Sequence, residues 1–248
     1  MRSRTSAAVI LVLLARMLTP SAVAQALPPG FVYLRDLDPT IEQDIRYAGP
    51  ENFVGHALPG YEAAECVLRE PAAHALAAVQ TDLQSQGLGL KVYDCIRPAR
   101  AVRAIVGWAG DGASDRIDDR FFPHIAKGAL LARGYIAANS THSTGLAVDL
   151  TLVARDASRE IRPPGGPCHE PADDSLEMGT TFDCFDPMAH TADPAIGASA
   201  QQHRALLVAA MQRRGFANYR REWWHFSLPD GGLARRPFDF PIVARPAR

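Results

Sequence analysis

The chain has 248 residues, of which 47% are hydrophobic and 21% are charged, and its formal net charge is −1. This length suits one large domain or two small ones and is ample for a hydrophobic core. The apolar fraction excludes a disordered chain, and the near-neutral charge gives no general electrostatic reason to bind nucleic acid or an anionic membrane.

Residues 1–24 have the layout of a secretory signal peptide. A positive start at Arg2 and Arg4 precedes an apolar run over residues 7–15, and a small-x-small exit follows at residues 22–24. The alternative is a membrane anchor, but a spanning helix needs about 20 apolar residues, and Arg16 interrupts this run. We therefore expect export, most simply to the periplasm, and a mature domain over residues 25–248 with no stable membrane anchor.

The first half of the mature chain alternates between β-prone and helical patterns. Residues 31–47 suggest an early strand and turn, and residues 52–61 are rich in Gly and Pro and predict a loop. Residues 70–86 predict a helix, because Pro71 lies at its start, Gly87 follows its end and apolar residues recur at helical spacing. A strand over 88–93 and a helix over 100–108 should follow.

The second half contains a nearly continuous β-prone run over 146–153. The next segment, 156–200, is long and irregular, and loops of that length usually carry function or are locally cross-linked. A helix over 200–215 and a strand over 222–228 complete the pattern. With no internal repeat and no linker in the sequence, we expect one domain.

The four cysteines, Cys66, Cys95, Cys168 and Cys184, form no CxxC pair, which argues against a structural thiolate zinc site. An even number in an oxidising compartment favours two disulfides. Three connectivities exist; chain order and short loop closure favour Cys66–Cys95 and Cys168–Cys184. The alternative is four buried thiols, since Cys readily behaves as a small core residue.

Two short segments, residues 140–149 and 222–225, hold the side chains for a metal-dependent reaction. A catalytic zinc takes three protein ligands and keeps one position for water. His142, Asp149 and His225 meet that count, and Glu222 remains to accept a proton from the water. The alternative is that these histidines are hydrogen-bonded structural residues. Trp223 and Trp224 are interpreted as core and pocket wall.

At this spacing, the side chains can reach one metal ion only if the backbone departs from a regular strand. His142 and Asp149 are seven apart, which on one regular strand would point them to opposite faces. They can converge if His142 lies on a loop before the strand, and Gly145 permits such a turn. Glu222 and His225 are three apart and need a helical turn or a bulge.

Arg97 follows the predicted strand and precedes Pro98, which favours an extended or turn conformation there. A guanidinium that stays charged can hold a developing oxyanion or a carboxylate. The alternative is an ordinary surface salt bridge.

The pattern SxHxxGxAxD followed by ExWH resembles the zinc peptidases that cleave D-alanyl peptides, and the fuller pattern resembles the VanX-type D-alanyl-D-alanine dipeptidases. The matching stretches run in order along almost the whole mature chain. They are DIRYAGPENFVG (44–55), GYE (60–62), VYDCIRPARAV (92–102), GYIAANSTHSTGLAVDLTL (134–152), MGTTFDCFD (178–186), EWWHF (222–226) and FDFP (238–241).

The resemblance implies a compact α+β domain with a central antiparallel sheet flanked by helices, as in the D-Ala-D-Ala metallopeptidase and hedgehog-like folds. It implies one Zn²⁺ per chain and a small-molecule substrate, D-Ala-D-Ala. The implied roles are zinc binding by His142, Asp149 and His225, proton transfer by Glu222, oxyanion stabilisation by Arg97, and substrate contacts by Asp183, Tyr47 and Ser140.

One residue departs from the family pattern: Ile96 stands where a Tyr commonly precedes the matching Arg. Two other functions compete with a dipeptidase. A peptidoglycan D,D-carboxypeptidase would use the same metal site with an open cleft. A non-catalytic zinc fold used for binding would need neither Glu222 nor Arg97.

Overall fold

A computed structural model of the chain describes residues 26–112, 115, 117–155, 167–169, 174–232 and 236–246. The predicted signal peptide, residues 1–24, lies outside this range. Within it, no helix has the length and apolar character needed to cross a bilayer.

In the part of the chain that the structure describes, seven strands form two sheets. The smaller sheet pairs β1 (Phe31–Tyr33) with β3 (Val67–Arg69). The larger one has the order β2-β4-β5-β7-β6, formed by β2 (Glu42–Gln43), β4 (Leu88–Asp94), β5 (Ala147–Ala154), β7 (His225–Ser227) and β6 (Ala217–Asn218). The predicted antiparallel sheet is confirmed for all pairs except the edge strand β2, which runs parallel to β4.

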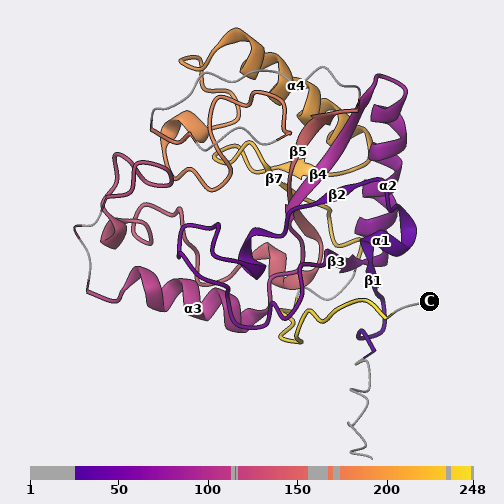
Figure 1. Ribbon diagram of the computed structural model, residues 1–248, viewed down its shortest axis with the longest axis horizontal. Helices are drawn as coiled ribbons and strands as arrows, with labels where there is room; N and C mark the ends of the chain where they lie inside the picture. The colour runs from indigo at the N-terminus through magenta and orange to yellow at the C-terminus, as the bar shows by residue number, and fades with distance from the viewer. Residues whose placement is uncertain are drawn as a thin grey trace, which may run out of the picture.

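Helices α2 (Glu70–Gln84) and α4 (Ala198–Arg213) flank this sheet, as the family resemblance implied. The described residues form two further helices, α1 (Leu34–Leu37) and α3 (Ala99–Ala109). The described residues also form four short 3₁₀ helices: η1 (Arg46–Ala48), η2 (Lys127–Ala129), η3 (Thr141–Thr144) and η4 (Pro187–Ala189). In Figure 1, α2 and α4 lie beside the strands at the right and top, whereas α3 lies apart from them at the lower left.

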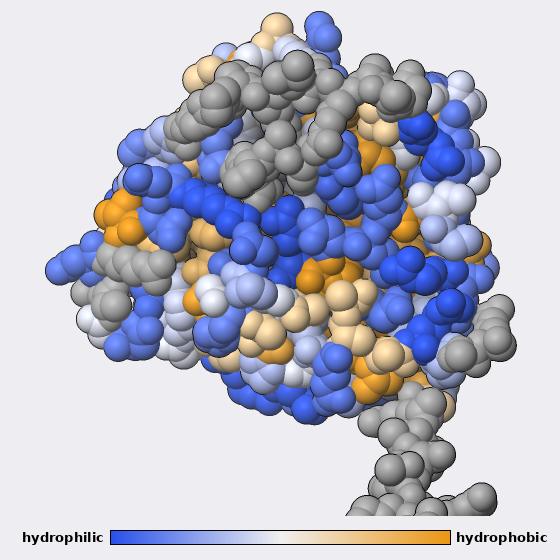
Figure 2. Space-filling view, in the orientation of Figure 1, coloured by the Kyte–Doolittle hydropathy of each residue, from blue (hydrophilic) through white to orange (hydrophobic). Residues whose placement is uncertain are grey.

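One part of the core lies where α2 packs against β4. Along α2, Ala72, Leu76, Val79 and Leu83 recur at helical spacing and are buried, and the helix packs against β4 and α4. Strand β5 is buried from Ala147 to Val153, as expected for a central strand covered on both faces. On the face seen in Figure 2, hydrophilic residues predominate and apolar residues show in smaller patches.

One sequence prediction was too simple. Residues 31–47 were expected to form a strand and a turn, but β1 ends at Tyr33 and the chain enters the short helix α1. Leu34 is fully buried there, and its backbone N–H donates to the carbonyl of Cys66. The alternating pattern predicted a longer strand, but the contact of Leu34 with the chain next to β3 favours a helix here instead.

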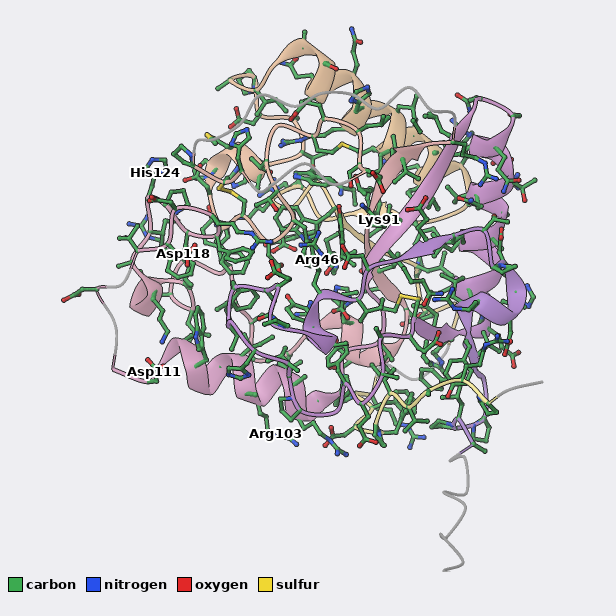
Figure 3. The ribbon with its side chains drawn as sticks, in the orientation of Figure 1. Arg46, Lys91, Arg103, Asp111, Asp118 and His124 are labelled. Atoms are coloured by element: carbon green, nitrogen blue, oxygen red, sulfur yellow. A yellow bond between two sulfur atoms is a disulfide. The ribbon has the colours of Figure 1, made fainter. Side chains whose placement is uncertain are left out.

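Helix α3 presents an apolar side to the interior and a charged side to solvent. Val102 and Ile105 are buried. Arg103 lies at the outer edge of the molecule, and Asp111 lies just beyond the end of the helix (Figure 3). Arg103 donates to Asp239 of the C-terminal segment. This orientation lets α3 form one wall of the cavity described below.

Candidate active site

Three side chains from neighbouring elements bring their ligand atoms together. His142 comes from η3, Asp149 from β5 and His225 from the start of β7, where it pairs directly with Asp149. His225 Nδ1 lies 3.0 Å from His142 Nε2 and 2.9 Å from Asp149 Oδ1, and His142 Nε2 lies 3.1 Å from Asp149 Oδ2. All candidate ligand atoms lie within 4.8 Å of one another. Such a three-residue donor set is suited to a catalytic zinc.

Backbone turns in both segments let these side chains converge despite their spacing in the sequence. His142 lies on η3, before β5 begins, so the odd step along one strand does not apply. Ser140 caps this turn by accepting from the His142 N–H, and Gly145 ends it with φ 74°. A Cβ at Gly145 would lie 2.5 Å from Phe31 Cε1, so this position needs glycine for both conformation and space.

At the second segment, a tight backbone turn precedes β7. The N–H of His225 donates to the carbonyl of Glu222, and the N–H of Glu222 donates to the carbonyl of Tyr219. This turn aims the side chains at positions 222 and 225 to the same side. Glu222 Oε2 lies 4.0 Å from His225 Nδ1.

Hydrogen bonds on the far side of each imidazole orient the ring. His142 Nδ1 lies 2.8 Å from the carbonyl oxygen of Cys95. A carbonyl can only accept, so Nδ1 carries a proton, and Nε2 is the nitrogen that faces the cluster. His225 Nε2 lies 3.1 Å from Thr141 Oγ1 and 3.2 Å from Ser227 Oγ, which leaves Nδ1 as its inward nitrogen. Such outer partners fix the orientation of metal ligands.

Arg97 is held beside the cluster by a buried carboxylate. Its Nε and Nη2 donate to Asp94 Oδ2 at 2.9 and 2.8 Å, and Nη2 also lies 3.5 Å from Asp149 Oδ2. Asp94 is fully buried and also accepts from the Tyr61 hydroxyl at 2.6 Å. Burial opposes the charge of Arg97, but Tyr47 and Asp94 raise its pKa, so the guanidinium stays protonated.

Glu222 has the electrostatics of a proton-transfer group. Burial, followed by the neighbouring charge of Asp149, raises the pKa of its carboxyl to about 8. A carboxyl with a pKa near the working pH can both accept and return a proton.

Asp183 and Tyr47 form a second polar pair in the cavity. The Tyr47 hydroxyl donates to Asp183 Oδ2 at 2.8 Å, and both residues are buried. Burial, followed by the charge of Asp149, holds the pKa of the Asp183 carboxyl well above its usual range. Burial makes the negative charge of this carboxyl unfavourable, so a cation that binds beside it would stabilise the charged form.

These features share one cavity of about 400 Å³. All eight residues for which a catalytic, substrate-binding or metal-binding role was predicted line it: Tyr47, Arg97, Ser140, His142, Asp149, Asp183, Glu222 and His225. The remaining wall is largely apolar and includes Val102 and Ile105 of α3. The structure thus brings the predicted residues together, while their individual roles stay predictions.

Four supporting residues were not identified from the sequence: Asp94, Tyr61, Thr141 and Ser227. Asp94 stands three residues before Arg97 at the end of a predicted strand, which is a weak signal for an ion pair. A register shift between Val92 and Asp94 brings Asp94 opposite Asp149. The departure at Ile96 is a buried apolar side chain, and the hydroxyl that contacts Asp94 comes from Tyr61.

The predicted disulfide pairing is present. Cys66 bonds to Cys95, and Cys168 bonds to Cys184, with Cα–Cα distances of 5.3 and 5.4 Å. The alternative of four buried thiols is therefore wrong.

An α+β domain whose cavity joins a His₂Asp cluster to a carboxylate and a guanidinium defines a peptidase of the zinc metallopeptidase type. A family model described as "D-ala-D-ala dipeptidase" matches residues 28–243. The chain belongs to the D-Ala-D-Ala dipeptidase family.

Curated relatives agree with this assignment. The D-alanyl-D-alanine dipeptidases of Enterococcus faecium and Streptomyces coelicolor are each 32% identical to this chain, over 86% of it and 98% of their own length. That of Escherichia coli is 32% identical over 83% of this chain and 85% of its own. Among solved structures, a vancomycin-resistance D,D-pentapeptidase in complex with Zn(II) matches with a TM-score of 0.35 and 14% identity, over 68% of this chain and 76% of that one.

Proposed function

We propose that this protein hydrolyses the dipeptide D-alanyl-D-alanine to two molecules of D-alanine, with one Zn²⁺ per chain. The observation that carries the proposal is the shared cavity, which joins the His142, Asp149 and His225 cluster to Glu222 and Arg97. The dipeptidase names of the relatives supply the substrate class.

The residues present fit zinc. Two imidazoles and one carboxylate are a usual donor set, and the His142 Nδ1–H bond to Cys95 leaves its other nitrogen ready to bind a metal. When bound, zinc supplies a Lewis acid that polarises a carbonyl and lowers the pKa of water.

Glu222 and Arg97 have separate tasks in the reaction. Glu222 accepts a proton from the attacking water and then delivers it to the nitrogen of the leaving D-alanine. Its side chain is largely buried and lies beside His225, at the edge of the candidate ligand cluster. The Arg97 guanidinium, fixed by Asp94, stabilises the negative charge that develops on the carbonyl oxygen of the scissile bond.

The second polar pair accounts for selection of a dipeptide. Asp183, supported by Tyr47, pairs with the free ammonium of the substrate. Ser140 lines the same cavity, and its hydroxyl can still donate to substrate while its oxygen accepts from the His142 N–H. A longer peptide has an amide where the ammonium should be and leaves a buried carboxylate unpaired, which costs affinity.

We also propose that the protein acts after export, most simply in the periplasm. The signal-peptide pattern over residues 1–24 and the two disulfides support an oxidising compartment. Mass spectrometry of protein from the periplasmic fraction should find Gln25 as the first residue; an uncleaved chain in the cytoplasm would contradict this.

The experiment that tests the function compares two substrates on purified zinc-loaded protein. D-Ala-D-Ala should be cleaved at least about 10²-fold more efficiently than a pentapeptide ending in D-Ala-D-Ala, because the pentapeptide leaves Asp183 unpaired. The reverse preference would identify a D,D-carboxypeptidase. Zinc binding without cleavage of either peptide would indicate a binding domain.

A further inference from the structure

Two buried carboxylates of the cavity region that are not candidate zinc ligands share a feature of sequence. Asp94 and Asp183 are each followed directly by a disulfide-bonded cysteine, Cys95 and Cys184. Asp94 is the last residue of β4, and Asp183 lies in a turn of the long segment before η4. The two disulfides therefore attach to the chain directly after these carboxylates, one at the end of a strand and one in a turn.

The first disulfide lies behind the ligand cluster. Cys66, next to β3, and Cys95, just after β4, are both buried. The Cys95 carbonyl accepts from His142 Nδ1 at 2.8 Å, and its N–H donates to Asp94 Oδ1 at 2.9 Å. One residue thus contacts both a candidate zinc ligand and the carboxylate that holds Arg97.

The second disulfide adjoins the Asp183–Tyr47 pair. Asp183 has φ 60°, a left-handed conformation that is unfavourable for a residue with a Cβ and persists only where its surroundings impose it. Cys168, the partner of Cys184, is anchored by its N–H to the carbonyl of Asp119 and by its carbonyl to the N–H of Thr181, each at 2.7 Å. The bond from Cys168 to Cys184 ties the residue after Asp183 to this anchor.

We propose that the two disulfides are separate positioning elements of the active site. Cys66–Cys95 holds the residues that retain zinc and stabilise the oxyanion, and Cys168–Cys184 holds the carboxylate that binds the substrate ammonium. The inference rests on the proposed function for its kinetic part, but its metal part does not depend on which peptide is cleaved.

The test compares two paired variants, C66A/C95A and C168A/C184A, each the control for the other. Three quantities are measured: zinc release from the loaded protein to a chromogenic chelator, kcat and KM for D-Ala-D-Ala, and Tm. In C66A/C95A, zinc release should be at least about tenfold faster, the low end of the effect of lost outer contacts on metal affinity. Its kcat should fall with little change in KM.

In C168A/C184A, KM should rise by about tenfold while zinc release stays within about twofold of the unmodified protein. The disulfides join residues 29 and 16 positions apart, so their loop-closure terms are similar and both variants should lose comparable Tm. A general loosening of the fold would change both variants alike, and such parallel changes would overturn the proposal, as would no change in either.

If a variant does not fold, the zinc-loaded protein can be treated with a phosphine reductant. Thiol blocking and mass spectrometry then show which pair has opened. Faster zinc release must coincide with opening of Cys66–Cys95, and release that follows Cys168–Cys184 instead would refute the assignment. Should the protein not cleave D-Ala-D-Ala, the proposed function fails and the ammonium part falls with it, but zinc release still decides the metal part.

Discussion

Replacing Asp183 with Asn isolates the charge that should recognise the substrate ammonium. Asn has nearly the same volume, and its amide oxygen can still accept from Tyr47, whose hydroxyl lies 2.8 Å from Asp183 Oδ2. Asp183 is only 4% exposed. Removing one partner of a buried ion pair costs about 3–5 kcal/mol, and each 1.36 kcal/mol is tenfold. We therefore expect kcat/KM for D-Ala-D-Ala to fall by about 10²- to 5 × 10³-fold, chiefly through KM.

The assay measures initial rates of D-alanine release together with zinc content. Tyr47→Phe is the matched control: it removes one neutral hydrogen-bond donor worth about 0.5–1.5 kcal/mol, so its KM should rise by about tenfold or less. Zinc content should be unchanged in both variants. An unaltered KM in Asp183→Asn, or loss of zinc in proportion to activity, would refute the reasoning and make Asp183 a structural residue.

Three other predictions concern Glu222 and Gly145. Glu222→Gln should keep zinc and lose at least about 10²-fold in kcat, the scale of a lost proton-transfer group; unchanged turnover would remove Glu222 from the mechanism. In metal-free protein the pKa of Glu222 is about 8 against an ordinary 4.5, so the folded state binds the proton more tightly. Stability should therefore fall as pH rises from about 4.5 to 8, and denaturant unfolding should show a weaker fall in Glu222→Gln; equal slopes would contradict this. Gly145→Ala should destabilise the fold by about 2–4 kcal/mol, from its positive φ and the clash with Phe31, and a Tm within 2 °C of the unmodified protein, well inside the shift expected for that loss, would argue against it.

The main elements were predictable because their signals are local. Helix α2 shows both its start, at Pro71, and its end, before Gly87, and the structure ends it two residues earlier than predicted because the last residues form a turn. The β5 run was evident from its apolar residues. Residues 34–37 were not predictable as a helix, since burial of Leu34 depends on a contact with Cys66 far along the chain.

In the candidate site too, residues with a local signal were predictable and residues that depend on long-range contacts were not. Residue types and order were enough to select His142, Asp149, Glu222 and His225, because few side chains bind zinc or move protons. Asp94 was missed because its contacts arise only when the chain after β4 folds against η3. In the structure, Asp94 Oδ2 lies 2.9 Å from Arg97 Nε and 3.4 Å from His142 Nδ1. The sequence pattern alone does not show that these atoms come together.

The most direct test of a zinc-dependent dipeptidase is a metal titration of the purified, disulfide-intact protein. Chelation should abolish D-Ala-D-Ala hydrolysis, and added Zn²⁺ should restore it in proportion up to one equivalent per chain. Asp149→Ala, which removes one of the three predicted ligands, should fail to regain activity at that equivalent. Hydrolysis that persists after complete removal of metal, or full recovery in Asp149→Ala, would contradict the account.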